Sequence, residues 1–390
     1  MARRGAIQSI LTEPDLPAPP APAGPTLLPV ARPSLPGFEA LAPYLRRIDE
    51  GRWYSNFGPL LTTFEARLAD RFGSGAQVVT VVNATQALTL ALLALDLPRG
   101  ALCMVPSYTF VATAHAVVAA GLTPWFVDVD PADWMLSPGA ARELLATAPG
   151  PVRAVVPVAA FGAAPDLAGW KALREETGIE VVIDAAAAFD TACDCDLPTI
   201  VSLHATKALG VGEGGFLATT DTGLAERVRR LTTFGFHGER LALVPATNAK
   251  LSEYAAAMGL AALDAWPTTR LRYLRASQFM RMALSQTKIG FQPGWGADWV
   301  TSVCVVRLPA GAHAAEVEAR LEADGVQTRR WWGEGCHANP AFRDHPRAGL
   351  ATTKALAQSV IGLPFAVDLD AQEASRIALA LERALDAGRG

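Results

Sequence analysis

Short apolar runs alternate with amphipathic stretches along most of the chain. Nearly continuous runs of branched aliphatic residues predict buried strands at residues 77–82, 102–105, 124–129, 153–158, 179–184, 200–203 and 216–219. Apolar residues at helical spacing, such as Phe64, Leu68 and Phe72, predict helices at residues 61–72, 84–95, 109–120 and 165–177. Continuous apolar strands between amphipathic helices are typical of an α/β protein, with a mainly parallel sheet covered by helices on both faces.

The pattern changes after a long helical stretch at residues 251–265, which Pro267 is expected to end. A strand with alternating polarity and three helices are expected beyond it, at residues 300–307, 314–323, 351–361 and 371–387. We therefore expect a large domain over residues 51–266 and a small C-terminal α+β domain over residues 267–390. Residues 1–50 would form a Pro-rich N-terminal arm, extended over residues 14–36, and a first helix after Gly37.

Composition narrows the functional classes. The chain has 390 residues, 51% of them hydrophobic, and a net charge of −4, which gives no electrostatic reason to expect nucleic acid or an anionic membrane as a partner. No apolar stretch approaches 18 residues, and the N-terminal pattern does not match a secretory signal. Five cysteines, an odd number, suit a reducing compartment, so a cytoplasmic location is expected. Neither Cys193 with Cys195 nor Cys336 with His337 has metal-site spacing, so no metal is expected.

Two residues that could carry chemistry follow consecutive predicted strands. Asp184 ends a fully apolar strand, where a buried carboxylate needs a cationic or hydrogen-bonding partner. Lys207 lies 23 positions later, just after the next strand, and an amine there can form a Schiff base with a carbonyl. An aspartate that pairs with a pyridinium nitrogen and a lysine that takes an aldehyde are the layout that holds pyridoxal 5'-phosphate (PLP). Parallel α/β sheets bind ligands at the strand ends where both residues lie.

Other polar and aromatic residues fall at the same kind of position. Asn83, Thr85 and Gln86 open a helix directly after the first strand, so they could bind a phosphate or simply cap the helix. Ser202 ends a later strand, five positions before Lys207, and could donate to the same phosphate. Phe110 follows the second strand, where it could stack on a flat heterocycle or pack in the core.

A glycine cluster follows Lys207. Gly210, Gly212 and Gly215 have the spacing of a dinucleotide-binding fingerprint, but that motif must follow a strand and open a helix. Here the cluster precedes a strand, so we expect a loop whose backbone passes close to the lysine.

These motifs, in this order, resemble the sugar-nucleotide aminotransferases of the DegT/StrS type, which are fold-type-I PLP enzymes. The likeness covers roughly residues 50–365. It rests on Asn56-Phe57-Gly58-Pro59, Asn83-Ala84-Thr85-Gln86-Ala87, Pro106-Ser107-Tyr108-Thr109-Phe110-Val111-Ala112-Thr113, Phe126-Val127-Asp128-Val129-Asp130, Asp184-Ala185-Ala186, Ser202-Leu203-His204-Ala205-Thr206-Lys207, Gly212-Glu213-Gly214-Gly215 and Thr247-Asn248-Ala249-Lys250.

The resemblance implies a role for each site residue. Lys207 would carry the cofactor and act as acid and base in catalysis, and Asp184 would keep the ring nitrogen protonated. The remaining cofactor-binding residues would be Thr85, Gln86, Phe110, Ser202 and Asn248. Phe110 would stack on the ring, while Asn248 would reach the phosphate in the neighbouring subunit, which implies a homodimer with shared active sites.

The implied reaction moves an amino group from an amino acid, by resemblance L-glutamate, to a nucleotide-linked keto sugar. Related dehydratases have His at the lysine position, so the presence of Lys207 argues against that activity. An aminotransferase acting on a keto-cyclitol or a related keto compound remains an alternative, as does a non-catalytic sensor that binds PLP or a sugar nucleotide.

The chain departs from the family pattern at two positions. Ala187 stands where the family has Gln or His after Asp-Ala-Ala, and Ala160 stands where a His often precedes the Phe-Gly pair. For the sugar and its diphosphate we expect the stretch from Arg329 to Trp332, with His337 nearby; a solvated basic pair beside core tryptophans is the alternative. Arginines at positions 270, 272, 275 and 281 are expected mainly on a solvated face.

Overall fold

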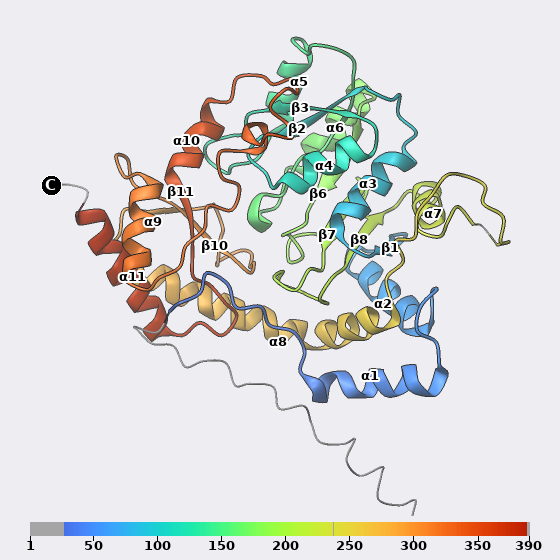
Figure 1. Cartoon of the computed structure of the whole chain (residues 1–390), viewed down its shortest axis with the longest axis horizontal. Coiled ribbons are helices and arrows are strands. Elements are labelled where there is room, and N and C mark those ends of the chain that lie inside the picture. Colours follow the sequence, from blue (N-terminus) through green and yellow to red (C-terminus); the bar gives the residue numbers. More distant parts are fainter. Residues whose placement is uncertain (1–26, 237, 388–390) are drawn as a thin grey trace, which may run out of the picture.

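The structure is a computed structural model that describes residues 27–236 and 238–387. A mostly parallel sheet forms the centre of the molecule (Figure 1). Its strands are β1 (Gln77–Val81), β2 (Leu102–Pro106), β3 (Thr123–Val127), β4 (Val152–Val155), β5 (Glu180–Val181), β6 (Ile183–Asp184), β7 (Thr199–Ser202) and β8 (Gly215–Thr219). They pair in the orders β3-β2-β4-β5 and β6-β7-β8-β1. Only Val182 separates β5 from β6, and its amide bonds to the carbonyl of Val155. The two sets therefore form one continuous sheet.

Strand direction explains where the sheet can bind a ligand. Every pairing is parallel except those of β8, which runs antiparallel to both β7 and β1. The carboxyl ends of the other strands therefore meet at one edge, and β8 begins there. This arrangement confirms the predicted α/β class with a mainly parallel sheet.

Helices cover both faces of the sheet. They are α2 (Pro59–Ala69), α3 (Ala84–Ala94), α4 (Val111–Ala119), α5 (Pro138–Leu145), α6 (Leu167–Thr177) and α7 (Thr222–Leu231). Side chains alternate along each strand, so Met104 joins the core that contains α2 and α6, while Cys103 and Val105 join the core under α3, α4 and α7. Helices α5 and α7 were not predicted from the sequence.

A long helix, α8 (Glu253–Ala283), passes beneath the sheet and on to the C-terminal part (Figure 1). The prediction that Pro267 ends this helix is wrong. Proline in a helix interior costs about 3 kcal/mol, but buried residues before and after it, among them Leu260, Tyr273 and Met280, hold the helix in place. The predicted domain boundary therefore falls inside α8. Helix α1 (Phe38–Gly51) packs against α8.

The C-terminal part contains a small antiparallel sheet of β9 (Gly290–Phe291), β10 (Cys304–Arg307) and β11 (Val360–Leu363), in the order β11-β10-β9. Helices α9 (Ala314–Ala323), α10 (Ala351–Ser359) and α11 (Ala371–Asp386) accompany it, and α11 packs on α8 and α9. We call residues 290–387 the small unit. The helix predicted over residues 351–361 is too long, because the chain turns into β11 at Val360, where it pairs with β10. None of the helices that the structure describes is long and apolar enough to cross a membrane.

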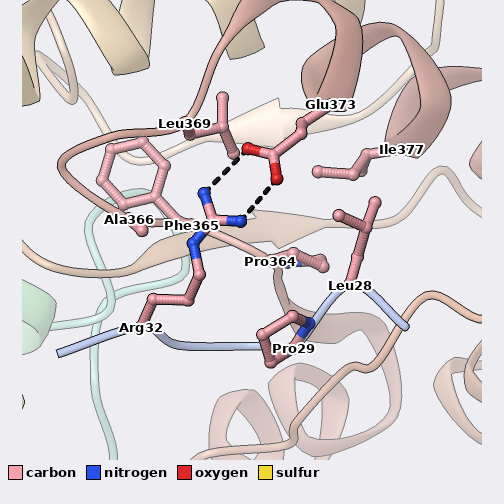
Figure 2. Close-up of a pocket in the computed structure, with 9 residues that line it drawn as sticks. All are labelled: Leu28, Pro29, Arg32, Pro364, Phe365, Ala366, Leu369, Glu373 and Ile377. Carbon is pink, nitrogen blue, oxygen red and sulfur yellow. Dashed lines mark hydrogen bonds and ion pairs between the residues drawn. The ribbon is translucent and has the colours of Figure 1, made fainter. Parts of the chain in front are cut away.

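The described part of the N-terminal arm, residues 27–36, lies on the small unit of its own chain. Leu28 forms a bridge with Val326 and Ala31 forms one with Phe365. Figure 2 shows Arg32 reaching the carboxylate of Glu373 on α11, with an Nη2 to Oε2 distance of 2.7 Å. The rest of the predicted arm, residues 14–26, lies outside the described residues.

Candidate active site

A cavity of about 690 Å³ lies at the carboxyl ends of the parallel strands. Its volume is within the range of about 300–1,000 Å³ that is usual for small-molecule sites. Six of the seven residues predicted to bind the cofactor line it: Thr85, Gln86, Phe110, Asp184, Ser202 and Lys207. The strand-end argument therefore brought together residues that lie up to 122 positions apart (207 − 85) in the sequence.

Asp184 lies at the tip of β6, with 8% of its surface exposed. Its Oδ2 accepts a hydrogen bond of 2.7 Å from the Thr113 hydroxyl, and its Oδ1 accepts one of 3.1 Å from the Ala186 amide. Burial raises the pKa of Asp184, while these two bonds and the nearby charge of Lys207 act against the rise. The carboxylate is therefore oriented by protein donors and has lone pairs left for a cationic partner in the cavity.

Lys207 projects into the same cavity from the turn after β7. Burial lowers the pKa of its amine, and the charge of Asp184 partly opposes that effect. Among the described residues, Lys207 forms no ion pair with a carboxylate, although it lies close enough to Asp184 for the two charges to interact. An amine with a depressed pKa is a better nucleophile and base near neutral pH.

The N-terminus of α3 forms another part of the cavity wall. Asn83 Oδ1 accepts a hydrogen bond of 2.8 Å from the Gln86 amide, so Asn83 caps the helix. Gly215 of β8 lies directly behind this turn: a Cβ added there would come within 2.4 Å of the Ala84 nitrogen. Thr85 also lines the cavity at this helix start, a kind of position that favours an anion, whereas the Gln86 amide already has an acceptor.

Phe110 and Asn248 differ in position. Phe110 is the N-cap residue of α4, lines the cavity and is 58% exposed, so it is a cavity-wall residue and not a core residue. Asn248 is exposed and lies outside the cavity of its own chain, where its side chain accepts a hydrogen bond from Lys250. Its predicted contact with a neighbouring subunit's cofactor stays a prediction.

Only some of the residues predicted to bind the sugar and its diphosphate line the cavity. Arg329, Trp331 and Trp332 line the cavity, and the Arg329 guanidinium lies 5.0 Å from the Trp331 ring centroid. Arg330 instead forms ion pairs with carboxylates of α9 and of its own loop, and buried His337 is hydrogen-bonded to Ser107 at 2.7 Å.

The two departures from the family pattern lie on one side of the cavity. Ala187 lines it, while Ala160 is buried beside Phe161. Phe161 stacks on Trp332, with ring centroids 3.9 Å apart and planes inclined by 13°. Phe161 also has φ of 54°, which is unfavourable for a bulky residue. At Ala187 and Ala160 the chain therefore has small apolar side chains where the resemblance led us to expect Gln or His, beside the aromatic pair of Phe161 and Trp332.

Sequence analysis missed several cavity residues. Thr301 and Ser302 come from the small unit, while Glu213, quoted in a family motif without a role, lies in the glycine loop with its Oε1 3.6 Å from His204 Nε2. Thr113 was part of a recognised motif but had no assigned role. It lies four positions after Thr109, a spacing that places both hydroxyls on one side of a helix start and could have indicated a pair.

The residues present fit PLP. A buried carboxylate, an amine that forms no ion pair within the described ranges, an aromatic ring exposed in the cavity wall and a helix N-terminus held close by Gly215 surround one space. They match, in turn, the ring nitrogen, the aldehyde, the flat ring and the phosphate of that cofactor.

Comparisons with known proteins agree with this geometry. The family model described as DegT/DnrJ/EryC1/StrS aminotransferase family matches residues 39–382. A crystal structure of DesI in the presence of its TDP-sugar product has a TM-score of 0.83 and 33% identity, covering 95% of each chain.

Two sequence relatives also have informative names. The UDP-2-acetamido-2-deoxy-3-oxo-D-glucuronate aminotransferase of Pseudomonas aeruginosa is 30% identical, over 83% of this chain and 90% of the relative. The erythromycin biosynthesis sensory transduction protein EryC1 of Saccharopolyspora erythraea is 30% identical, over 86% and 93% respectively. With its fold, its cofactor-shaped cavity and a family match over nearly its whole length, the chain belongs to the DegT/DnrJ/EryC1/StrS family and is a PLP-dependent aminotransferase of fold type I.

Proposed function

We propose that this enzyme transfers the amino group of L-glutamate to a keto sugar linked to a nucleoside diphosphate. The observation that carries the proposal is the placement of Lys207 and Asp184 in one cavity of about 690 Å³, larger than a cofactor alone requires. Relatives support the substrate class, since one was crystallised with a TDP-sugar product and another is named for a UDP-linked 3-oxo sugar.

PLP, when bound, supplies an aldehyde that receives the amino nitrogen and a ring that accepts the electron pair released by proton removal. Lys207 would take the proton from Cα of the amino donor and return it to the cofactor-bound carbon that receives the amino group. The depressed pKa of its amine leaves more of the neutral base available for this step. With the keto sugar the same amine moves a proton in the opposite direction.

Asp184 holds a proton on the ring nitrogen, which keeps the ring able to accept charge. Phe110 would stack on the ring face, because its aromatic side chain is exposed in the cavity wall at the start of α4. Thr85, Ser202 and the first turn of α3 bind the phosphate. Asn248, exposed in a single chain, completes the phosphate site of the partner subunit in a homodimer.

Arg329, Trp331 and Trp332 form the part of the cavity that receives the sugar nucleotide. Arg329 makes no ion pair with a carboxylate within the described part of the chain, so its guanidinium is available for a diphosphate. The two tryptophans offer flat surfaces against which a sugar ring or a base can pack.

The test is a panel of nucleotide-linked 3-keto and 4-keto sugars with L-glutamate, in which product mass identifies the substrate that is aminated. Lys207→Ala is expected to abolish turnover and the absorbance band of the bound cofactor, and borohydride reduction of the wild type should attach the cofactor to Lys207. Full activity in Lys207→Ala would show that the catalytic base is a different residue. Amination of a free keto-cyclitol in preference to every sugar nucleotide would contradict the substrate class.

A non-catalytic sensor is the competing function, because a relative of similar length is named as a sensory transduction protein. Glutamate distinguishes the two functions. An enzyme loses its cofactor absorbance band when L-glutamate is added and recovers it when a keto acceptor follows, whereas a sensor leaves the band unchanged.

A further inference from the structure

Two threonine hydroxyls form a short chain behind Asp184. The Thr113 hydroxyl donates to Asp184 Oδ2 at 2.7 Å, and the Thr109 hydroxyl lies 3.2 Å from the Thr113 hydroxyl. Thr113 and Thr109 are 1% and 2% exposed, so water does not compete for these bonds. Both threonines lie at the start of α4, Thr109 just before the helix and Thr113 in its first turn.

The direction of these bonds follows from the number of protons. A hydroxyl has one proton, and Thr113 uses its proton on the carboxylate, so the bond between the two threonines must be donated by Thr109. The small unit contacts this pair, because Cys336 Sγ donates to the Thr109 carbonyl at 3.2 Å. Each hydrogen bond in such a chain polarises the next one, which strengthens the bond to the carboxylate.

Asp184 needs this support because burial favours its neutral form. Burial raises the pKa of Asp184, and the Thr113 bond is the largest influence that lowers it again. A protonated Asp184 could not hold a proton on a ring nitrogen, because the carboxyl group would then be a donor and not an anionic acceptor. The N-terminal end of α4, whose dipole favours a negative charge, adds to the same effect.

We propose that Thr113, with Thr109 behind it, is a positioning residue that keeps Asp184 ionised and turned toward the cofactor ring nitrogen. The proposal rests on the cofactor role given to Asp184 under the proposed function. It does not depend on which sugar or amino donor the enzyme uses.

The test measures the affinity of the apoenzyme for two cofactors by fluorescence quenching. One is PLP, and the other is its 1-deaza analogue, which has a C–H group in place of the ring nitrogen. A hydrogen bond to a charged group is worth enough that Thr113→Val should weaken PLP binding about tenfold or more. Binding of the analogue should change less than about threefold, because the analogue makes no bond to Asp184. Thr113→Ser keeps the hydroxyl and should bind PLP like the wild type.

Equal weakening of both cofactors by Thr113→Val, or no weakening at all, would overturn the proposal and leave Thr113 a purely structural residue. If Thr113→Val does not fold, Thr109→Val removes the second hydroxyl and should still weaken PLP more than the analogue; an equal effect overturns the proposal. Asp184→Asn separates the two levels of inference. If Asp184→Asn still binds PLP in preference to the analogue as the wild type does, the role given to Asp184 is wrong. If Asp184→Asn loses this preference but Thr113→Val keeps it, only the role given to Thr113 is wrong.

Discussion

Gly215 allows β8 to pass directly behind the turn that is proposed to bind the cofactor phosphate. In Gly215→Ala the new Cβ would lie 2.4 Å from the Ala84 nitrogen and 2.7 Å from both Ala84 Cα and the Asn83 carbonyl carbon. All three atoms belong to the backbone, so no side chain can rotate away. Ordinary van der Waals contacts begin at about 3.4 Å, so the strand and the turn must separate by about 1 Å (3.4 − 2.4). Overpacking of a tight site costs about 1–3 kcal/mol, and a rigid backbone neighbour favours the upper end.

The displacement should also affect cofactor binding, because the first amides of α3 lie in the turn that moves. We expect the apoenzyme of Gly215→Ala to be less stable by about 2–3 kcal/mol in urea unfolding. Its affinity for PLP should fall about tenfold, which corresponds to about 1.4 kcal/mol of lost binding energy. Gly349→Ala is the matched control, since Gly349 is exposed and nothing lies within 4 Å of an added Cβ. If the two variants match each other in both measurements, the close approach of β8 to the turn does not support the site.

Three further substitutions test other parts of the structure. Gly259→Ala places a Cβ 2.4 Å from the ring of Phe64, so the free energy of unfolding in urea should fall by about 1–2 kcal/mol despite the better helix propensity of alanine. Adding Phe64→Leu to this variant should recover part of the lost stability. If the effects of the two substitutions simply add, the contact with Phe64 is not the cause of the loss. Arg32→Ala removes a partly exposed ion pair with Glu373 worth about 1 kcal/mol or less. Proteolysis of the arm before residue 36 should therefore become faster. An unchanged cleavage rate would show that other contacts hold the arm. Burial first, and nearby cations second, lower the pKa of His337 below its usual 6.5. His337 then binds its proton more tightly in the unfolded chain than in the folded protein. Its contribution to stability is therefore fully present above about pH 6.5 and is lost as the pH falls through the folded-state pKa. His337→Gln should flatten that decrease in unfolding measured across pH, and an unchanged slope would assign it to other groups.

The cofactor end of the cavity could be predicted because it depends on local rules. Parallel strands end at one edge, so residues that follow consecutive strands, such as Asp184 and Lys207, must meet there whatever the details of packing. Asn248 could not be derived in this way. Its predicted role came from the resemblance alone and concerns a contact between two chains.

Other features depended on packing between distant segments. Pro267 predicts the end of a helix by its own chemistry, but burial on both sides of it outweighs that preference. The apolar residues from Val360 to Leu363 suit a helix or a strand, and only the presence of β10 beside them decides for the strand. Thr113 has a role only because α4 starts beside the tip of β6, a contact across 71 positions of sequence.

The two ends of the cavity belong to different bodies of the fold. Lys207 and Asp184 are fixed to the central sheet, whereas Arg329 and Trp332 come from the small unit. The arm also belongs with the small unit, because Ala31, which lines the cavity, pairs with Phe365 of that unit. Any shift of the small unit against the sheet would therefore carry the three substrate-side residues together and leave the cofactor-side residues where they are. Substitutions in the small unit can therefore alter the substrate side of the cavity while Lys207 and Asp184 keep their places on the sheet. Ala160 and Ala187, the two departures from the family pattern, lie outside the small unit, so their effect on the cavity does not depend on such a shift.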